Sequence, residues 1–263
     1  MISLVTILRH ERIVIAAGLV GVVIVAWIYL WHGAGMGMSA RDMTTLSLFP
    51  HLQAEVGGSM SADWPVVIAM WWVMMIAMMT PSSAPLILLY GLVLRRHAKK
   101  GKDVFILTFL LLSGYLIAWL AFAVIATVFQ QLLEPAGLIS EMMLWSRSKV
   151  LSALVLAMAG LYQFSPLKHA CLAQCRSPVR FLTEYWRPGR LGSFILGVRH
   201  GAYCVGCCWM LMALLFVGGV MNLVWIAVLT VVVLMEKLLS AGEKIGRFSG
   251  GLLLIWAIAT MLM

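Results

Sequence analysis

Charged side chains are scarce in this sequence of 263 residues. Asp, Glu, Lys and Arg make up 11% of the chain, whereas hydrophobic residues make up 63% and the mean hydropathy is +1.00. Soluble domains carry about 25% charged and about 45–50% apolar residues. The shortage of charge excludes an ordinary soluble domain and predicts an all-α, polytopic membrane protein.

Two binding motifs are also missing. The sequence has no Gly-x-x-x-x-Gly-Lys-Ser/Thr loop, so transport driven by its own ATP hydrolysis is excluded. The net charge is +9, but the basic residues form short clusters between apolar runs, without a basic helix or an aromatic-interleaved groove. We therefore expect no nucleic-acid partner and assign the basic clusters to helix orientation and membrane lipid.

A cleavable leader and a second domain are likewise not predicted. The first apolar run, Ile13 to Trp31, is too long for a signal peptide and has no small-residue cleavage site before His32. No internal repeat is visible. Residues 1–263 are expected to form a single integral membrane domain.

Apolar runs of about 20 residues predict membrane-spanning helices. We place about seven, near residues 13–31, 64–94, 104–128, 150–166, 193–219, 223–241 and 245–262. Basic clusters alternate with sparsely basic loops, which predicts a cytoplasmic N-terminus and an external C-terminus. The second run contains Pro81 and Pro85, which predict a kinked or broken helix that either marks a binding site or only shapes packing.

Five cysteines in two tight groups stand out against this apolar background. They form Cys171-x-x-x-Cys175, beside Lys168-His169, and Cys204-x-x-Cys207-Cys208, beside Arg199-His200. Residues three or four apart share a helix face, so His200 and the second cysteine group should form one stripe, to which Cys171 and Cys175 can fold back. The predicted topology puts these thiols near the reducing cytoplasmic side, where stable disulfides are rare.

Soft-metal binding is the first interpretation of this stripe, with thiol redox chemistry and inert packing as the alternatives. Thiolates and thioethers favour Cu(I), zinc or iron–sulfur clusters, and the chain has 19 methionines. The spacing is not a repeated Cys-x-x-Cys pair, so a Cu(I) site with two or three thiolates ranks above a structural zinc site.

Methionines recur at two further places. The first external loop is rich in soft ligands and predicts metal capture: it holds His32, Met36, Met38, Met43, His51 and Met60. Met74 and Met78 lie on one face of the second helix and would offer weak sites at mid-membrane. Core packing is the alternative for the helical methionines.

Glu236 is the most informative carboxylate, because an acid inside a membrane segment is costly and usually marks a partner or pathway. Its alternative role is a helix-end residue that pairs with Lys237 or reaches the interface. The full set of candidate metal ligands is Cys204, Cys207, Cys208, Cys171, Cys175, His200, His169, Glu236, Met74 and Met78. We name no catalytic and no cofactor-binding residue.

Several stretches resemble a bacterial family of predicted metal-binding integral membrane proteins of unknown function. The resemblance runs through Met70-Trp71…Met74-Met75…Ala77-Met78-Met79-Thr80-Pro81-Ser82, Pro166-Leu167-Lys168…Cys171…Cys175-Arg176-Ser177-Pro178, His200-Gly201…Cys204-Val205-Gly206-Cys207-Cys208-Trp209, Met221-Asn222 and Glu236-Lys237. It covers most of the chain beyond the first helix. It implies metal binding by a bacterial integral membrane protein, and supplies neither a substrate nor a catalytic residue.

The sequence therefore predicts an inner-membrane protein that binds Cu(I) and either transports it or delivers it to a partner. Expected partners are membrane lipid and a metal-donor or metal-acceptor protein; oligomerisation stays open. The rival functions are a membrane thiol oxidoreductase, a subunit of a copper-dependent membrane oxidase, and a scaffold whose metal pins helices together. An enzyme is the less favoured class.

Overall fold

The computed structural model describes residues 4–35, 44, 63–97, 101–140 and 145–262. The described part of the chain is helical and contains no strand, apart from an isolated bridge between Ile139 and Ser146. The predicted all-α class is confirmed. The helices, in chain order, are α1 (Leu4–Trp31), α2 (Trp64–His97), α3 (Gly101–Leu133), α4 (Lys149–Tyr162), α5 (Pro166–Arg176), α6 (Pro178–Tyr185), α7 (Gly189–Ala213), α8 (Leu215–Gly218), α9 (Leu223–Leu238) and α10 (Gly242–Leu262).

Within the described residues, five stretches of helix are long and apolar enough to cross a membrane. They lie in α1, α2, α3, α7 with α8, and α10; α4 and α5 together form one further candidate, bent by 63°. Helix α9 has 16 residues, which is short for a span that needs roughly 20. Each predicted apolar segment is therefore helical, while the number of about seven spans stays a prediction.

The fourth predicted segment, 150–166, was wrong at its C-terminal end. Helix α4 stops at Tyr162, and a new helix begins after Ser165, whose hydroxyl accepts a hydrogen bond from the Lys168 amide at 3.1 Å. Pro166 occupies the first turn of α5, where its missing N–H costs nothing. Ser165 and Pro166 together start a separate helix, so the cysteines at 171 and 175 lie on α5 and not in an irregular connection.

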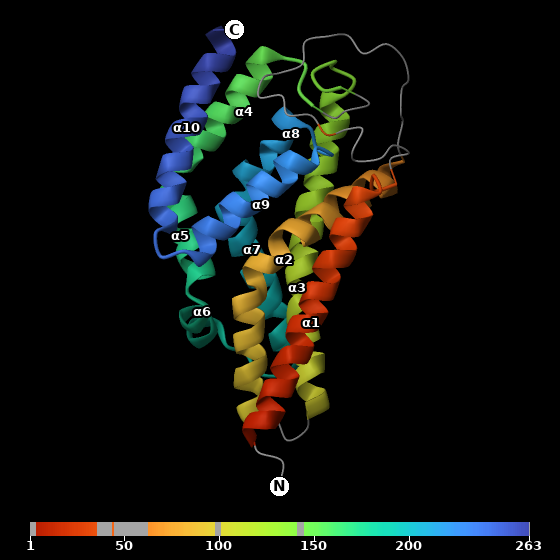
Figure 1. Cartoon of the computed structure of the whole chain (residues 1–263), viewed down its shortest axis with the longest axis vertical. Coiled ribbons are helices and arrows are strands. Elements are labelled where there is room, and N and C mark those ends of the chain that lie inside the picture. The colour runs from red at the N-terminus through yellow and green to blue at the C-terminus, as the bar shows by residue number, and fades with distance from the viewer. Residues whose placement is uncertain (1–3, 36–43, 45–62, 98–100, 141–144, 263) are drawn as a thin grey trace.

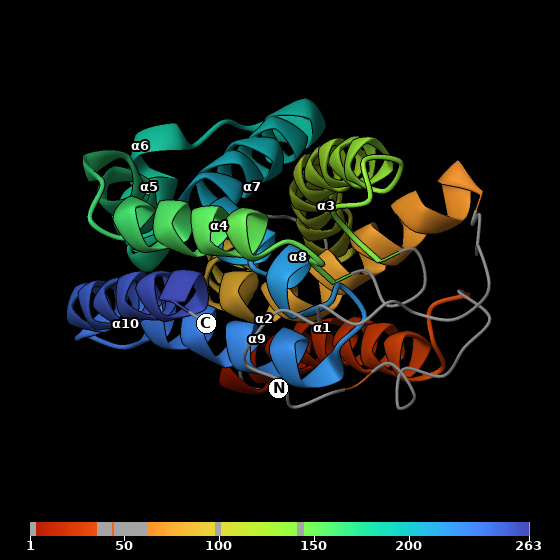
Figure 2. The same ribbon diagram turned by 90° about the horizontal axis from the view of Figure 1, so that it is seen from above.

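Helix α2 is continuous through both prolines, so a broken helix was the wrong alternative. Its ribbon changes direction partway along its length, as expected for a helix that lacks donors at Pro81 and Pro85 (Figure 1). Helix α2 contacts α1, α3 and α9, and in Figure 2 it lies between a row containing α3 and α7 and a row containing α1, α9 and α10. Pro81 is half-buried and Pro85 is exposed, whereas Ser82 and Ser83 between them are buried.

Helices α3 and α7 pack against each other through glycines. A side chain at Gly197 would collide with the Leu111 carbonyl of α3, and one at Gly114 would collide with the Phe194 carbonyl of α7. Small residues at such crossings allow close backbone approach between apolar helices. This contact fixes the cysteine-bearing helix α7 in the bundle.

The helices alternate in direction along the long axis of the molecule. In Figure 1, α1 begins at the lower end, α2 returns, α3 ascends, α4 and α5 descend, α7 ascends, α9 descends and α10 ends at the top. The start of α1 and the end of α10 thus lie at opposite ends. One large core cluster joins residues of α1, α2, α3, α4, α5, α7, α9 and α10, and it includes the cysteines of α7.

Candidate metal centre

The predicted stripe on α7 is confirmed. His200, Cys204, Cys207 and Cys208 are all buried, and the three cysteines are each 1% exposed. They occur at successive separations of four, three and one residues, so they face the interior together. All five cysteines of the chain are free thiols.

Cys175 brings a fourth thiol to this stripe from α5. Its thiol lies close enough to those of Cys204 and Cys207 to interact with them, and the thiol of Cys208 also lies close to these two. We call Cys175, Cys204, Cys207 and Cys208 the thiol cluster. The prediction that the first cysteine group folds back onto α7 is confirmed for Cys175.

The thiols lie beside one another without converging on a common point. Cys207 Sγ and Cys208 Sγ donate to the Cys204 carbonyl at 3.1 and 2.9 Å. Within the described residues, no group of three or more His, Cys, Asp or Glu side chains is arranged as a finished metal site. Binding a metal ion here therefore requires at least one thiol to rotate away from the backbone carbonyl.

A lysine reaches the thiol cluster from α9. The Lys237 ammonium donates to Cys204 Sγ at 2.8 Å and to Ser82 Oγ at 3.2 Å, and the lysine side chain is buried. A buried ammonium is stable only with polar or anionic partners. Sequence reasoning treated Lys237 only as a partner for Glu236; its position in an apolar segment was the available signal for a site residue.

Helices α2 and α3 complete the wall around Cys204. The Tyr115 hydroxyl lies 3.2 Å from Cys204 Sγ and donates to the Met79 carbonyl at 2.9 Å, a carbonyl that also accepts from Ser82 Oγ at 2.8 Å. Cys208 Sγ lies 3.8 Å from the thioether sulfur of Met79. The segment around Pro81 thus contributes a soft ligand atom and two polar contacts to the site.

His200 and His169 differ in their relation to the thiols. His200 stacks on Tyr115, and its buried Nδ1 has no hydrogen-bond partner, so this nitrogen could accept a bond or a metal after a small movement. His169 is half-buried on α5. The geometry favours His200 over His169.

Cys171 lies one turn before Cys175 and is half-buried. It is near Cys207, and a side chain at Gly206 would come within 2.8 Å of its sulfur. Gly206 therefore allows Cys171 to approach α7 closely. Cys171 is more accessible than the three buried cysteines of α7.

Glu236 faces a different partner from the thiols. It is 2% exposed, and its Oε2 lies 2.6 Å from the ammonium of Lys168, which also donates to Gln163 Oε1. Glu236 Oε1 is buried without a hydrogen-bond partner. The alternative in which Glu236 pairs with Lys237 or reaches the interface was wrong, because the side chain points inward and is paired with Lys168 of α5.

Met74 and Met78 are fully buried in the core cluster that contains the cysteines, but the thioether beside a thiol belongs to Met79. Of the predicted external capture loop, the structure describes His32, which is exposed. The other members of that loop, Met36, Met38, Met43, His51 and Met60, lie outside the described residues.

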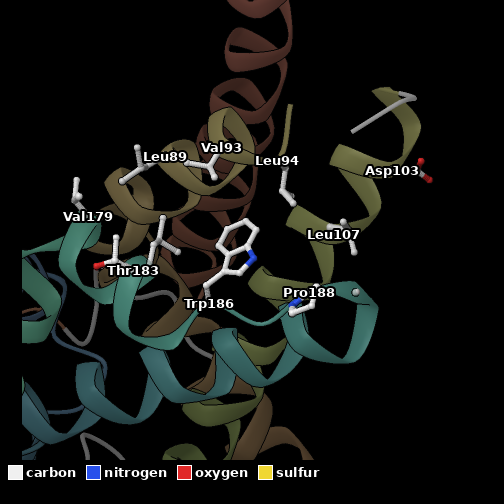
Figure 3. Close-up of a pocket in the computed structure, with 11 residues that line it drawn as sticks. Leu89, Val93, Leu94, Asp103, Leu107, Val179, Thr183, Trp186 and Pro188 are labelled. Atoms are coloured by element: carbon white, nitrogen blue, oxygen red, sulfur yellow. The ribbon is translucent and has the colours of Figure 1, made fainter. Parts of the chain in front are cut away.

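An open apolar cavity of about 870 Å³ lies elsewhere, between the end of α2, the start of α3, α6 and the start of α7. Trp186 occupies its middle, with Leu89 and Val93 on one side and Asp103 at the far edge (Figure 3). None of the described residues that line it is a cysteine, histidine or methionine. This cavity is not the candidate metal centre.

The fold and the thiol cluster define an all-helical protein with a buried group of soft sulfur ligands. Sulfur ligands of this kind suit Cu(I) above harder ions. Residues 68–260 match the model of the PpoB2 family, described as copper chaperones, and the chain belongs to this family. Comparisons with curated proteins and with solved structures give no significant match.

Proposed function

We propose that this protein is an inner-membrane copper chaperone that holds Cu(I) on the thiol cluster and passes it to an acceptor protein. The observation that carries the proposal is the meeting of four free thiols, three of them buried on α7 and one half-buried on α5. Family membership supports copper binding and delivery in general. The thiols supply the soft anionic ligands that Cu(I) prefers.

Loading uses small movements within the cluster. Cys207 and Cys208 give up their bonds to the Cys204 carbonyl and turn toward the metal ion. Met79 lies close enough to Cys208 to add a thioether, and the unpaired Nδ1 of His200 offers a nitrogen one turn from Cys204. A binding site that forms on loading suits a carrier, because the ligands must also let the ion leave.

Delivery takes place on the α5 side. Cys171 is more exposed than the thiols of α7 and lies near Cys207, so it can receive Cu(I) from the buried cluster and present it to an acceptor. Helix α5 is joined to α4 at a 63° bend, and its other end is held by Arg176, which donates to the Leu239 and Ser240 carbonyls. Movement of this short helix would uncover the cluster.

The membrane location and orientation belong to the same proposal. Five helical stretches long and apolar enough to span a bilayer support it, as does the alternation of helix direction in Figure 1. Lys and Arg clusters put the α5 and α6 side in the cytoplasm. A reporter fused after Arg180 should report the cytoplasm and one fused after Leu262 the opposite side; exchange of the two signals would contradict this orientation.

The copper site is tested with purified protein loaded with Cu(I) under reducing conditions. Wild-type protein should retain copper through gel filtration, and Cys204→Ser with Cys207→Ser should lose at least about nine-tenths of it, because thiolates are the tightest ligands for a soft ion. The matched variant Cys171→Ser, on the outer side of the cluster, should retain copper and transfer it more slowly to a Cu(I) chelator. Unchanged copper content in the double variant would contradict the site.

The same variants separate copper handling from thiol exchange. An oxidoreductase attacks a disulfide through a mixed intermediate, so replacement of one cysteine traps a partner in a reducible cross-link. We expect no such cross-link for Cys204→Ser or Cys207→Ser in membranes. A trapped partner, together with copper-free wild-type protein, would contradict the copper chaperone function and favour a membrane thiol oxidoreductase.

A further inference from the structure

Lys237 places a positive charge directly at the thiol cluster. Its Nζ is 2.8 Å from Cys204 Sγ, and the side chain is 5% exposed. The four thiols of the cluster lie close enough for their ionised forms to attract this ammonium. Removing a charge from water is costly unless an opposite charge or full hydrogen bonding compensates. The lysine therefore needs negative charge from the groups around it.

The other buried charges nearby compensate each other. Lys168 and Glu236 form an ion pair at 2.6 Å, and both side chains are about as buried as Lys237. Among the described Lys, Arg, Asp and Glu residues, these three are the buried ones. The charge of Lys237 is thus left for the thiols to balance.

Charge balance then distinguishes between metal ions. Two thiolates, one Cu(I) and one ammonium add up to zero, whereas the same groups with Zn(II) leave one positive charge in an apolar core. Zinc could reach neutrality only with a third thiolate, within a closed tetrahedral set of ligands. Cu(I) therefore needs two of the thiols as thiolates, whereas zinc needs a third sulfur to ionise in an apolar core.

We infer that Lys237 is a specificity-determining residue: its ammonium balances a two-thiolate Cu(I) complex and makes the buried cluster prefer this ion to Zn(II). The inference rests on the proposed copper site. It gives a reason for a lysine at a position where an apolar residue would pack without any cost of burial. It also assigns adjacent residues of α9 to separate tasks, since Glu236 holds α5 and Lys237 serves the metal ion.

The test compares Cu(I) and Zn(II) affinities of purified full-length variants by competition with chelators. Lys237→Met removes the charge and keeps most of the side-chain volume, and Lys237→Arg keeps the charge. We expect Lys237→Met to bind Cu(I) about 100-fold more weakly than wild type and to bind Zn(II) at least as tightly. Lys237→Arg should bind Cu(I) within about tenfold of wild type. Lys237→Gln, which can still bond to Ser82, provides a second uncharged variant if Lys237→Met does not fold.

The outcomes distinguish this inference from the proposed function. If wild-type protein holds Cu(I) through Cys204 and Cys207, and the uncharged variants keep the same ratio of Cu(I) to Zn(II) affinity, the role of Lys237 is refuted and the copper site stands. If wild-type protein binds no Cu(I), or binds it without these cysteines, the proposed function itself fails.

Discussion

Among the described residues, the buried lysines Lys168 and Lys237 differ in their partners. Lys168 faces the carboxylate of Glu236 and the amide oxygen of Gln163, all within the bundle. Lys237, the residue after Glu236, faces Cys204 and Ser82. One lysine has a permanent counter-charge, and the other has thiols, which acquire negative charge when they ionise. Lys168 therefore has a structural role, and Lys237 belongs to the candidate metal centre.

The largest loss of stability is expected from removing the counter-charge of Lys168. Glu236→Gln leaves a buried ammonium without its carboxylate, which costs about 3–5 kcal/mol in proteins. We expect a large loss of thermal stability in detergent, followed by fluorescence on heating. The double variant Lys168→Met with Glu236→Gln should recover much of that loss, because neither charge then remains buried. A single variant as stable as wild type would show that the ion pair does not hold α5 in place.

The two cysteines of α5 test which thiols bind the metal ion. Cys175→Ser removes a member of the thiol cluster, and Cys171→Ser removes a neighbour one turn away. We expect Cys175→Ser to weaken Cu(I) binding by about tenfold to 100-fold, whereas Cys171→Ser should weaken it by less than about threefold. Chelator competition measures both. Equal losses of Cu(I) affinity would contradict the assignment of Cys175 to the thiol cluster and of Cys171 to a position outside it.

A smaller effect is expected at the wall of the site. Tyr115→Phe removes a hydroxyl that donates to the Met79 carbonyl and touches Cys204. A hydrogen bond of this kind contributes about 0.5–1.5 kcal/mol, so stability should fall by that amount and Cu(I) affinity by only a few-fold. Thermal unfolding and chelator competition on the same preparation check the two values. Loss of all copper binding would instead make Tyr115 part of the ligand set.

Local patterns in the sequence predicted the parts of the site that lie on one helix. The stripe of His200, Cys204, Cys207 and Cys208 follows from helical spacing, whereas its burial against the other helices is a result of packing. For Cys175, the sequence predicted only that its segment can fold back onto this stripe. The start of α5 at Ser165-Pro166 was the missed local signal that would have placed that cysteine on a helix.

Contacts between distant helices could not be predicted from spacing. The partner of Glu236 comes from α5, 68 residues away, and not from its neighbour in sequence. The thioether beside Cys208 comes from Met79, whereas the sequence favoured Met74 and Met78 as ligands. Which face of a uniformly apolar helix turns toward a given neighbour depends on packing, and the hydrophobic pattern does not record it.

X-ray absorption at the copper edge of the loaded protein tests directly whether the thiol cluster binds copper. We expect sulfur atoms to dominate the ligand shell of reduced copper in the wild-type protein. The double variant Cys204→Ser with Cys207→Ser should lose this shell together with the copper. A shell of nitrogen or oxygen atoms, or a sulfur shell that survives this double substitution, would contradict the thiol cluster as the copper site.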